Sequence, residues 1–154
     1  MSESEKIFED IFKIELEPTL LELGFSRYNL PKGWMQPSFL LKHNSKNIWF
    51  GCSWDWRDFD FEADLGNLYK FKDVMPRVII CGFAFERKCS TEYTTHEYIK
   101  EQIINTKSRI IDLANKDFEK YYKFISDAQN EKKHRLNFYI QKEIILVEEL
   151  PFIL

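Results

Sequence analysis

Residues 47–66 carry the clearest alternation of apolar and polar positions in the chain. Apolar side chains fall on even numbers from 48 to 56 and, after the polar pair Arg57-Asp58, on odd numbers from 59 to 65. Because side chains alternate between the two faces of a strand, a change of parity at a polar pair predicts a turn between antiparallel strands or a bulge in one strand. A single strand would run to about nineteen residues, far beyond the usual length, so the pattern favours a hairpin.

The predicted hairpin sorts its side chains into an apolar and an acidic face. Its facing pairs are all apolar: Trp56 with Phe59, Trp54 with Phe61, Cys52 with Ala63, and Phe50 with Leu65. We expect these side chains to point into the core, because a slip by one residue would bury carboxylates. The other face places Asp55 directly across from Asp60, where like charges repel. Its residues are Trp49, Ser53, Asp55, Asp60, Glu62 and Asp64.

Glycine and proline divide the chain into two parts. All five glycines lie within the first 82 residues, and no proline occurs between Pro76 and Pro151. Because these residues punctuate short elements and are excluded from helix interiors, we expect strands and turns first and helices later. The prediction for residues 1–154 is a single domain of the α+β class. It has an antiparallel sheet of four or five strands, with an N-terminal helix and a helical C-terminal half packed on it.

The N-terminal helix is predicted from a capping box and from helical spacing. Ser2 and Glu5 fit the capping box, and apolar side chains recur at positions 7, 11 and 14 and at 8 and 12. Pro18 is expected to kink or restart the helix. The helix should then end at Gly24, with Phe25 making the hydrophobic contact of a C-cap.

Two more strands and a helical C-terminal half complete the predicted elements. Residues 38–43 fit a strand that leads into the hairpin, and residues 78–85 are apolar on both parities, as in a central strand covered on both faces. A helix is expected from Thr94, which forms a second capping box with Glu97, and another from about residue 115. Residues 136–147 fit either a helix or a strand, and we prefer the helix. The first of these helices should bury Ile99, Ile103, Ile110, Leu113 and Ala114.

The charge of the chain is concentrated in the hairpin. The formal net charge is −3, whereas residues 55–64 hold five acidic side chains and one arginine. Binding to nucleic acid needs a clustered basic surface, so this distribution argues against a nucleic-acid partner and favours a cationic one. The three cysteines lack a C-x-x-C spacing, and the N-terminus lacks the layout of a signal peptide. No apolar run could span a bilayer, and we expect a cytoplasmic protein with reduced thiols and no membrane association.

Candidate chemistry is sparse along the chain. Asp58-x-Asp60-x-Glu62-x-Asp64 offers oxygen ligands, but Ala63 stands where a calcium loop needs glycine and Tyr69 where it needs glutamate. The same row of acids also fits a merely solvated strand face. The three histidines have no ligand spacing, and no nucleophile or phosphate-binding motif occurs. We therefore expect no metal, no cofactor and no catalytic residue.

Trp49 on the acidic face has two interpretations. Another element of the fold can cover it, as is common for tryptophan. If it is exposed, a large ring among carboxylates is typical of an interface hot spot that faces arginine or lysine. On the second interpretation the partner-binding residues are Trp49, Asp55, Asp58, Asp60, Glu62 and Asp64.

The layout of the whole chain resembles that of small bacterial α+β proteins. It has an N-terminal helix closing in LLELGF at residues 20–25, then strands rich in tryptophan, then a helical half with VEELP at residues 147–151. Some such proteins look like immunity proteins of toxin delivery systems, including contact-dependent inhibition. The resemblance implies a cytoplasmic protein that binds and neutralises a cognate toxin domain, often a nuclease with a basic surface. Two alternatives remain: a small metal- or ligand-dependent enzyme using Asp55, Asp60 and Glu62, and an adaptor subunit.

Overall fold

The computed structural model of the protein describes residues 2–57, 60–71, 78–84, 95–114 and 144–146. Within these residues, six strands form one sheet in which every neighbouring pair is antiparallel. The strands are β1 (Phe25–Arg27), β2 (Phe39–His43), β3 (Trp49–Asp55), β4 (Asp60–Phe71), β5 (Val78–Ala84) and β6 (Ile144–Leu146). The first five follow one another in chain order across the sheet, and β6 pairs with β4. The predicted α+β class is confirmed.

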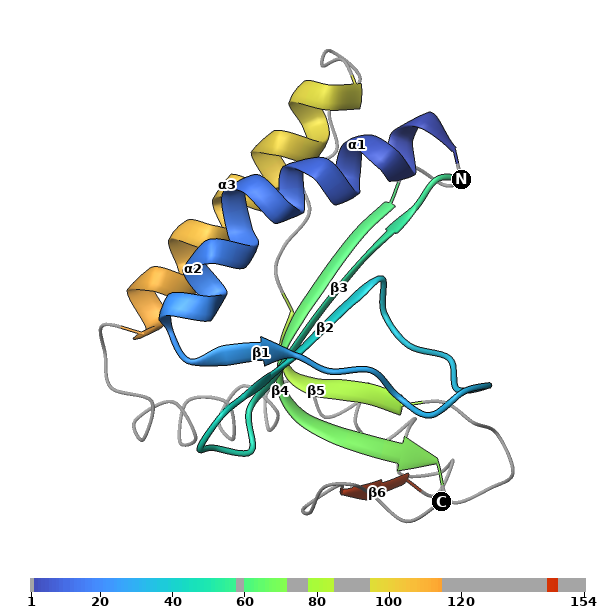
Figure 1. Ribbon diagram of the computed structural model, residues 1–154, viewed down its shortest axis with the longest axis vertical. Coiled ribbons are helices and arrows are strands. Elements are labelled where there is room, and N and C mark those ends of the chain that lie inside the picture. Colours follow the sequence, from blue (N-terminus) through green and yellow to red (C-terminus); the bar gives the residue numbers. More distant parts are fainter. Residues whose placement is uncertain (1, 58–59, 72–77, 85–94, 115–143, 147–154) are drawn as a thin grey trace.

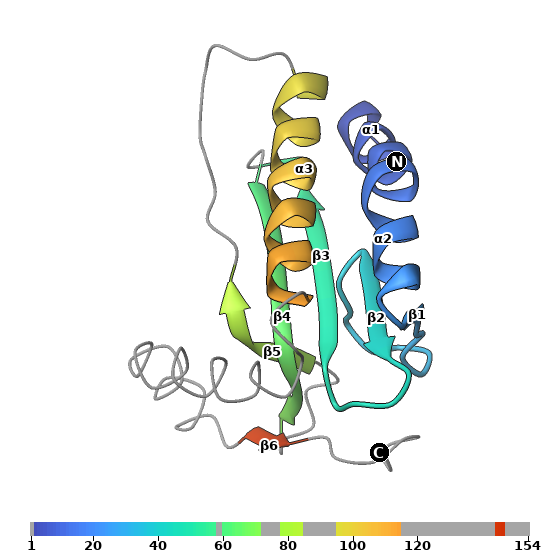
Figure 2. The same ribbon diagram turned by 90° about the vertical axis from the view of Figure 1, so that its left-hand side faces the viewer.

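The helices lie side by side on one face of this sheet (Figures 1 and 2). The N-terminal helix consists of α1 (Glu3–Ile11), the π-helical turn η1 (Phe12–Leu16) and α2 (Glu17–Glu22). It packs along α3 (Thr95–Ala114), which is the described part of the predicted helical half. The segment that joins β1 to β2 lies on the opposite side of the sheet (Figure 1). The two faces of the sheet are therefore covered in different ways.

The capping box, the restart at Pro18 and the end at Gly24 that were predicted for the N-terminal helix are confirmed, whereas Ile14 of the predicted apolar repeat is exposed. Ser2 accepts a hydrogen bond from the backbone N–H of Glu5, and the Glu5 side chain accepts one from the Ser2 backbone N–H. Pro18 lies in the first turn of α2, directly after η1, so the helix restarts there. Proline has no N–H to donate and its ring crowds the carbonyl four residues earlier, which the wider π turn accommodates. The chain leaves the helix at Gly24, whose φ is +94°.

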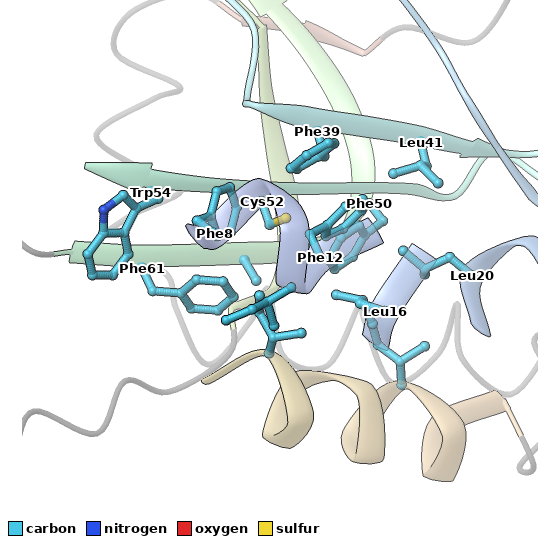
Figure 3. Close-up of a cluster of buried hydrophobic side chains, with 14 of the residues drawn as sticks. Phe8, Phe12, Leu16, Leu20, Phe39, Leu41, Phe50, Cys52, Trp54 and Phe61 are labelled. Carbon is cyan, nitrogen blue, oxygen red and sulfur yellow. The ribbon is translucent and has the colours of Figure 1, made fainter. Parts of the chain in front are cut away.

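The main core lies between the helices and the sheet (Figure 3). Phe8, Phe12, Leu16 and Leu20 recur every four residues, a spacing that drifts by about 40° per step around a regular helix. The π turn counteracts this drift, and all four side chains are buried. The Phe12 ring stacks on Phe39 of β2 with ring centroids 3.8 Å apart. From α3 the core receives Ile99, Ile103 and Ile110 as predicted, with Leu113 packed against it.

Two predictions about strands need correction. The segment 78–85 was expected as a central strand, but β5 lies at the end of the five-strand path, and β4 is the strand with most neighbours. The helix preferred over residues 136–147 is wrong at Ile144–Leu146, which form the sixth strand, β6. An apolar run does not reveal how many strands pair with it, which explains the first error. Short apolar runs also do not separate helix from strand by periodicity, which explains the second error. Residues 136–143 and the helix predicted from residue 115 lie outside the described residues.

Candidate partner-binding surface

The hairpin of β3 and β4 has the predicted register. Trp54 pairs with Phe61, Cys52 with Ala63, and Phe50 with Leu65, and all six side chains are buried in the main core. Asp55 pairs with Asp60, and Ser53 with Glu62. This register places Asp55, Asp60 and Glu62 together on the face away from the helices. The Trp56 and Phe59 pair cannot be compared, since residue 59 lies outside the described residues.

The three carboxylates line an open depression of about 370 Å³ at the end of the hairpin. Asp55 and Glu62 are exposed, and Asp60 is partly buried. A fourth carboxylate in the lining, Glu5, comes from the first turn of α1, which the hairpin holds through a bond of 2.9 Å from Trp54 Nε1 to Ser4 Oγ. We call this region, with Glu5, Asp55, Asp60 and Glu62, the acidic depression. Its lining combines the negative charges of α1, β3 and β4 with the positive charge of Arg57.

An aromatic side chain borders the acidic depression, although it is not the one predicted. Trp56, placed on the apolar face by its parity, is 47% exposed and lies in the lining. The Arg57 guanidinium lies 5.4 Å from the centroid of its ring, a cation–π distance. Trp56 comes directly after the last residue of β3, where strand alternation no longer fixes the direction of a side chain. The position of Trp56 at the end of the strand was the feature of the sequence that could have predicted its exposure.

Trp49 does not belong to the exposed surface. Its side chain is fully buried in a second apolar cluster, together with Leu30, Leu40, Leu68 and Val78. The segment between β1 and β2 covers it, with the Tyr28 ring edge-on at 5.1 Å between ring centroids. The indole N–H donates to Asn47 Oδ1 at 3.1 Å, so its polar atom is satisfied. Of the two interpretations of Trp49, the covered one is correct, and exposure as a hot spot is wrong.

Gly51 of β3 lies against apolar side chains. A Cβ atom at Gly51 would lie 2.8 Å from Ile80 Cδ1 and 3.0 Å from Pro37 Cγ, so apolar atoms cover the strand there. Asp64, which pairs with Gly51, is partly buried and does not line the acidic depression. Asp58, the remaining predicted site residue, lies outside the described residues. The structure thus brings together Asp55, Asp60 and Glu62 and adds Glu5, Trp56 and Arg57.

Other candidate chemistry is limited within the described residues. Burial, followed by the nearby charge of Asp64, raises the pKa of the Cys52 thiol well above its ordinary value, which disfavours the reactive thiolate. Among residues that the structure describes, no group of three or more histidine, cysteine, aspartate or glutamate side chains could hold a metal ion. Within those same ranges, no helix has the length and apolar character needed to cross a bilayer.

Comparison of the chain with protein-family models, with curated proteins and with solved structures found no significant match. Fold and surface together define a small α+β protein with helices on one face of an antiparallel sheet and an acidic depression at one end.

Proposed function

We propose that the protein is an immunity protein that binds a cognate toxin domain through the acidic depression and neutralises it stoichiometrically. The observation that carries this proposal is the convergence of Glu5, Asp55, Asp60 and Glu62 on one open depression bordered by an exposed tryptophan. The resemblance of the chain to immunity proteins supplies the class of partner, a toxin domain with a basic, nuclease-like surface. An acidic surface could occupy the substrate site of such an enzyme.

Electrostatics favours a cationic partner at this surface. Asp55 and Asp60 face each other across the strand pair, a position in which like charges repel. An arginine or lysine from a partner would reduce this repulsion as it binds. Trp56 adds a large ring that a guanidinium can stack on, and tryptophan and arginine are enriched among interface hot spots. The same region therefore offers charge and a flat apolar contact.

Charge reversal tests the proposal directly. The double variant D60K/E62K is expected to weaken binding to the toxin domain at least about tenfold, or roughly 1.4 kcal/mol. It should still fold, because a lysine introduced at position 60 would lie opposite Asp55 and replace a repulsion by an attraction. Affinity is measured by isothermal titration calorimetry with a toxin domain encoded beside this protein.

A matched control carries the same change of charge far from the hairpin. Glu22 and Asp112 are both exposed, close to the ends of α2 and α3 at the opposite end of the helical layer (Figure 1). Lysine is favourable near a helix C-terminus, so E22K/D112K should fold and bind like the wild type. Unchanged affinity in a folded D60K/E62K protein, or equal losses in the two double variants, would refute a role for the acidic depression.

Titration of inhibition separates the proposal from the enzyme alternative. An immunity protein protects against its toxin up to an endpoint near one molecule per toxin molecule. An enzyme using Asp55, Asp60 and Glu62 would protect in trace amounts over time, and Asp60→Asn would abolish that protection. A titration with a sharp endpoint that Asp60→Asn leaves in place supports the immunity proposal.

A further inference from the structure

His43 connects three elements at the end of the molecule away from the acidic depression. It ends β2 on the face toward the helices and is 8% exposed. Its Nδ1 atom accepts hydrogen bonds from the backbone N–H groups of Ser45 at 3.2 Å and Lys46 at 3.1 Å. The ring also forms a hydrogen bond with the backbone of Leu23 at the end of α2, which Nε2–H donates to the carbonyl. These contacts require the neutral imidazole with its proton on Nε2.

Hydrogen bonds connect the turn at residues 44–47 to neighbouring strands. The Asn44 N–H donates to the Gly24 carbonyl at 2.8 Å, and Ser26 Oγ donates to Asn44 Oδ1 at 2.8 Å. At the other end of the turn, Asn47 accepts from the Trp49 indole and, through its carbonyl, from Asn67 Nδ2 at 2.9 Å. The turn thus links α2 and β1 to β3 and β4.

The surroundings of His43 disfavour a second proton on the ring. Burial is the largest cause that lowers the pKa of His43, and the positive charges of Lys46 and Lys42 lower it further. Lys42 Nζ itself donates to the His43 carbonyl at 2.8 Å and so lies close by. The uncharged Phe25 ring of β1 packs at 90° to the His43 ring, with ring centroids 5.3 Å apart. The Leu23 carbonyl at the end of α2 also contacts the His43 ring. The carbonyl contact is the one that favours the charged form.

We propose that His43 is a pH-sensitive switch that holds the 44–47 turn when neutral and releases it on proton uptake. A proton from solvent that binds Nδ1 removes the acceptor used by the N–H groups of Ser45 and Lys46, and it adds a cation beside Lys46 and Lys42. The turn must then move so that its N–H groups reach water. Because Asn47 holds the Trp49 indole, the second apolar cluster loosens with it. This inference does not rest on the proposed function.

Nuclear magnetic resonance of the ¹⁵N-labelled wild-type protein tests the switch between about pH 8 and pH 5. At the upper end we expect the Nε2–H tautomer, and a titration midpoint below the ordinary histidine value of about 6.5. As His43 titrates, hydrogen-exchange protection factors of the Ser45 and Lys46 amides should fall by about tenfold or more. The Trp49 indole N–H resonance should shift with the same midpoint. A midpoint at or above the ordinary value, or turn amides that stay protected while His43 titrates, would overturn the proposal.

Two variants sharpen this test. His43→Asn retains an oxygen acceptor close to the position of Nδ1 but takes up no proton, so the protection of the turn should become independent of pH in this range. His96→Asn removes an exposed histidine of α3 and should leave the wild-type behaviour unchanged. If His96→Asn removed the pH dependence, or folded His43→Asn retained it, the switch would not be His43. If His43→Asn failed to fold, the wild-type titration would decide by itself.

Discussion

Trp49 and Trp56 lie at opposite ends of the same strand region and have opposite environments. Trp49 is fully buried beneath the segment that joins β1 to β2, whereas Trp56 is 47% exposed beside the acidic depression. Strand parity placed Trp56 on the apolar face and Trp49 on the acidic face, where it left open whether another element covers Trp49. Parity tells which face a side chain occupies but not whether another segment covers that face. The covering segment is irregular, and its apolar residues Tyr28, Leu30 and Trp34 carry no periodic signal.

Truncation of each tryptophan should separate stability from binding. Trp49→Ala empties a fully buried site and is expected to lower the free energy of unfolding by about 3 to 5 kcal/mol. Trp56→Ala removes a half-exposed ring and its contact with Arg57, a loss of at most about 1 kcal/mol. Urea denaturation monitored by circular dichroism measures both changes. Trp49 would belong to the binding surface after all if its truncation left stability intact and abolished partner binding.

At the level of elements, the sequence predicts those features that depend on residues close together in the chain. The hairpin register follows from alternation, because a slip by one residue would bury Asp60 or Glu62, and the capping box and Pro18 define the N-terminal helix. The position of β5 at the end of the sheet and the pairing of β6 with β4 depend on long-range contacts. Glu5 reaches the acidic depression by the same kind of contact, across almost fifty residues of chain. Periodicity within one segment contains no information about such partners.

Two glycines with positive φ provide a matched test of how α2 connects to β1. Gly24 has φ +94° and Gly33 has φ +93°, so alanine at either position is strained by about 1 to 2 kcal/mol. At Gly24 the added Cβ would also lie 3.0 Å from His43 Nε2, whereas at Gly33 nothing lies within 4 Å. His43 is held on both sides by hydrogen bonds and has little room to move.

We therefore expect Gly24→Ala to lower the free energy of unfolding clearly more than Gly33→Ala does. Thermal or urea denaturation of the two variants at neutral pH provides the comparison. Equal losses would mean that the imidazole adapts without cost and that backbone strain accounts for the whole effect.

The whole molecule is asymmetric in both packing and charge. Helices close one face of the sheet and the segment between β1 and β2 closes part of the other (Figure 1). The end of the hairpin carries the acidic depression. The acidic side chains of residues 55–64 exceed the single arginine there by more than the net charge of −3 of the whole chain. A localised field of this kind steers an oppositely charged partner toward one end of the protein.

Electrostatic steering predicts that salt acts mainly on the rate of association with a basic toxin domain. Screening shortens the Debye length from about 10 Å at 0.1 M to about 3 Å at 1 M ionic strength, so the long-range attraction is lost first. Charges at an interface rim chiefly change the association rate, whereas close contacts determine dissociation. Stopped-flow measurements across this range should show association slowing by at least about tenfold, with a smaller change in dissociation.

D60K/E62K should flatten this salt dependence. E22K/D112K should keep most of the salt dependence, because the two substituted positions lie at the far end of the helices. An association rate that is insensitive to salt in the wild type would show that the acidic depression does not guide the encounter.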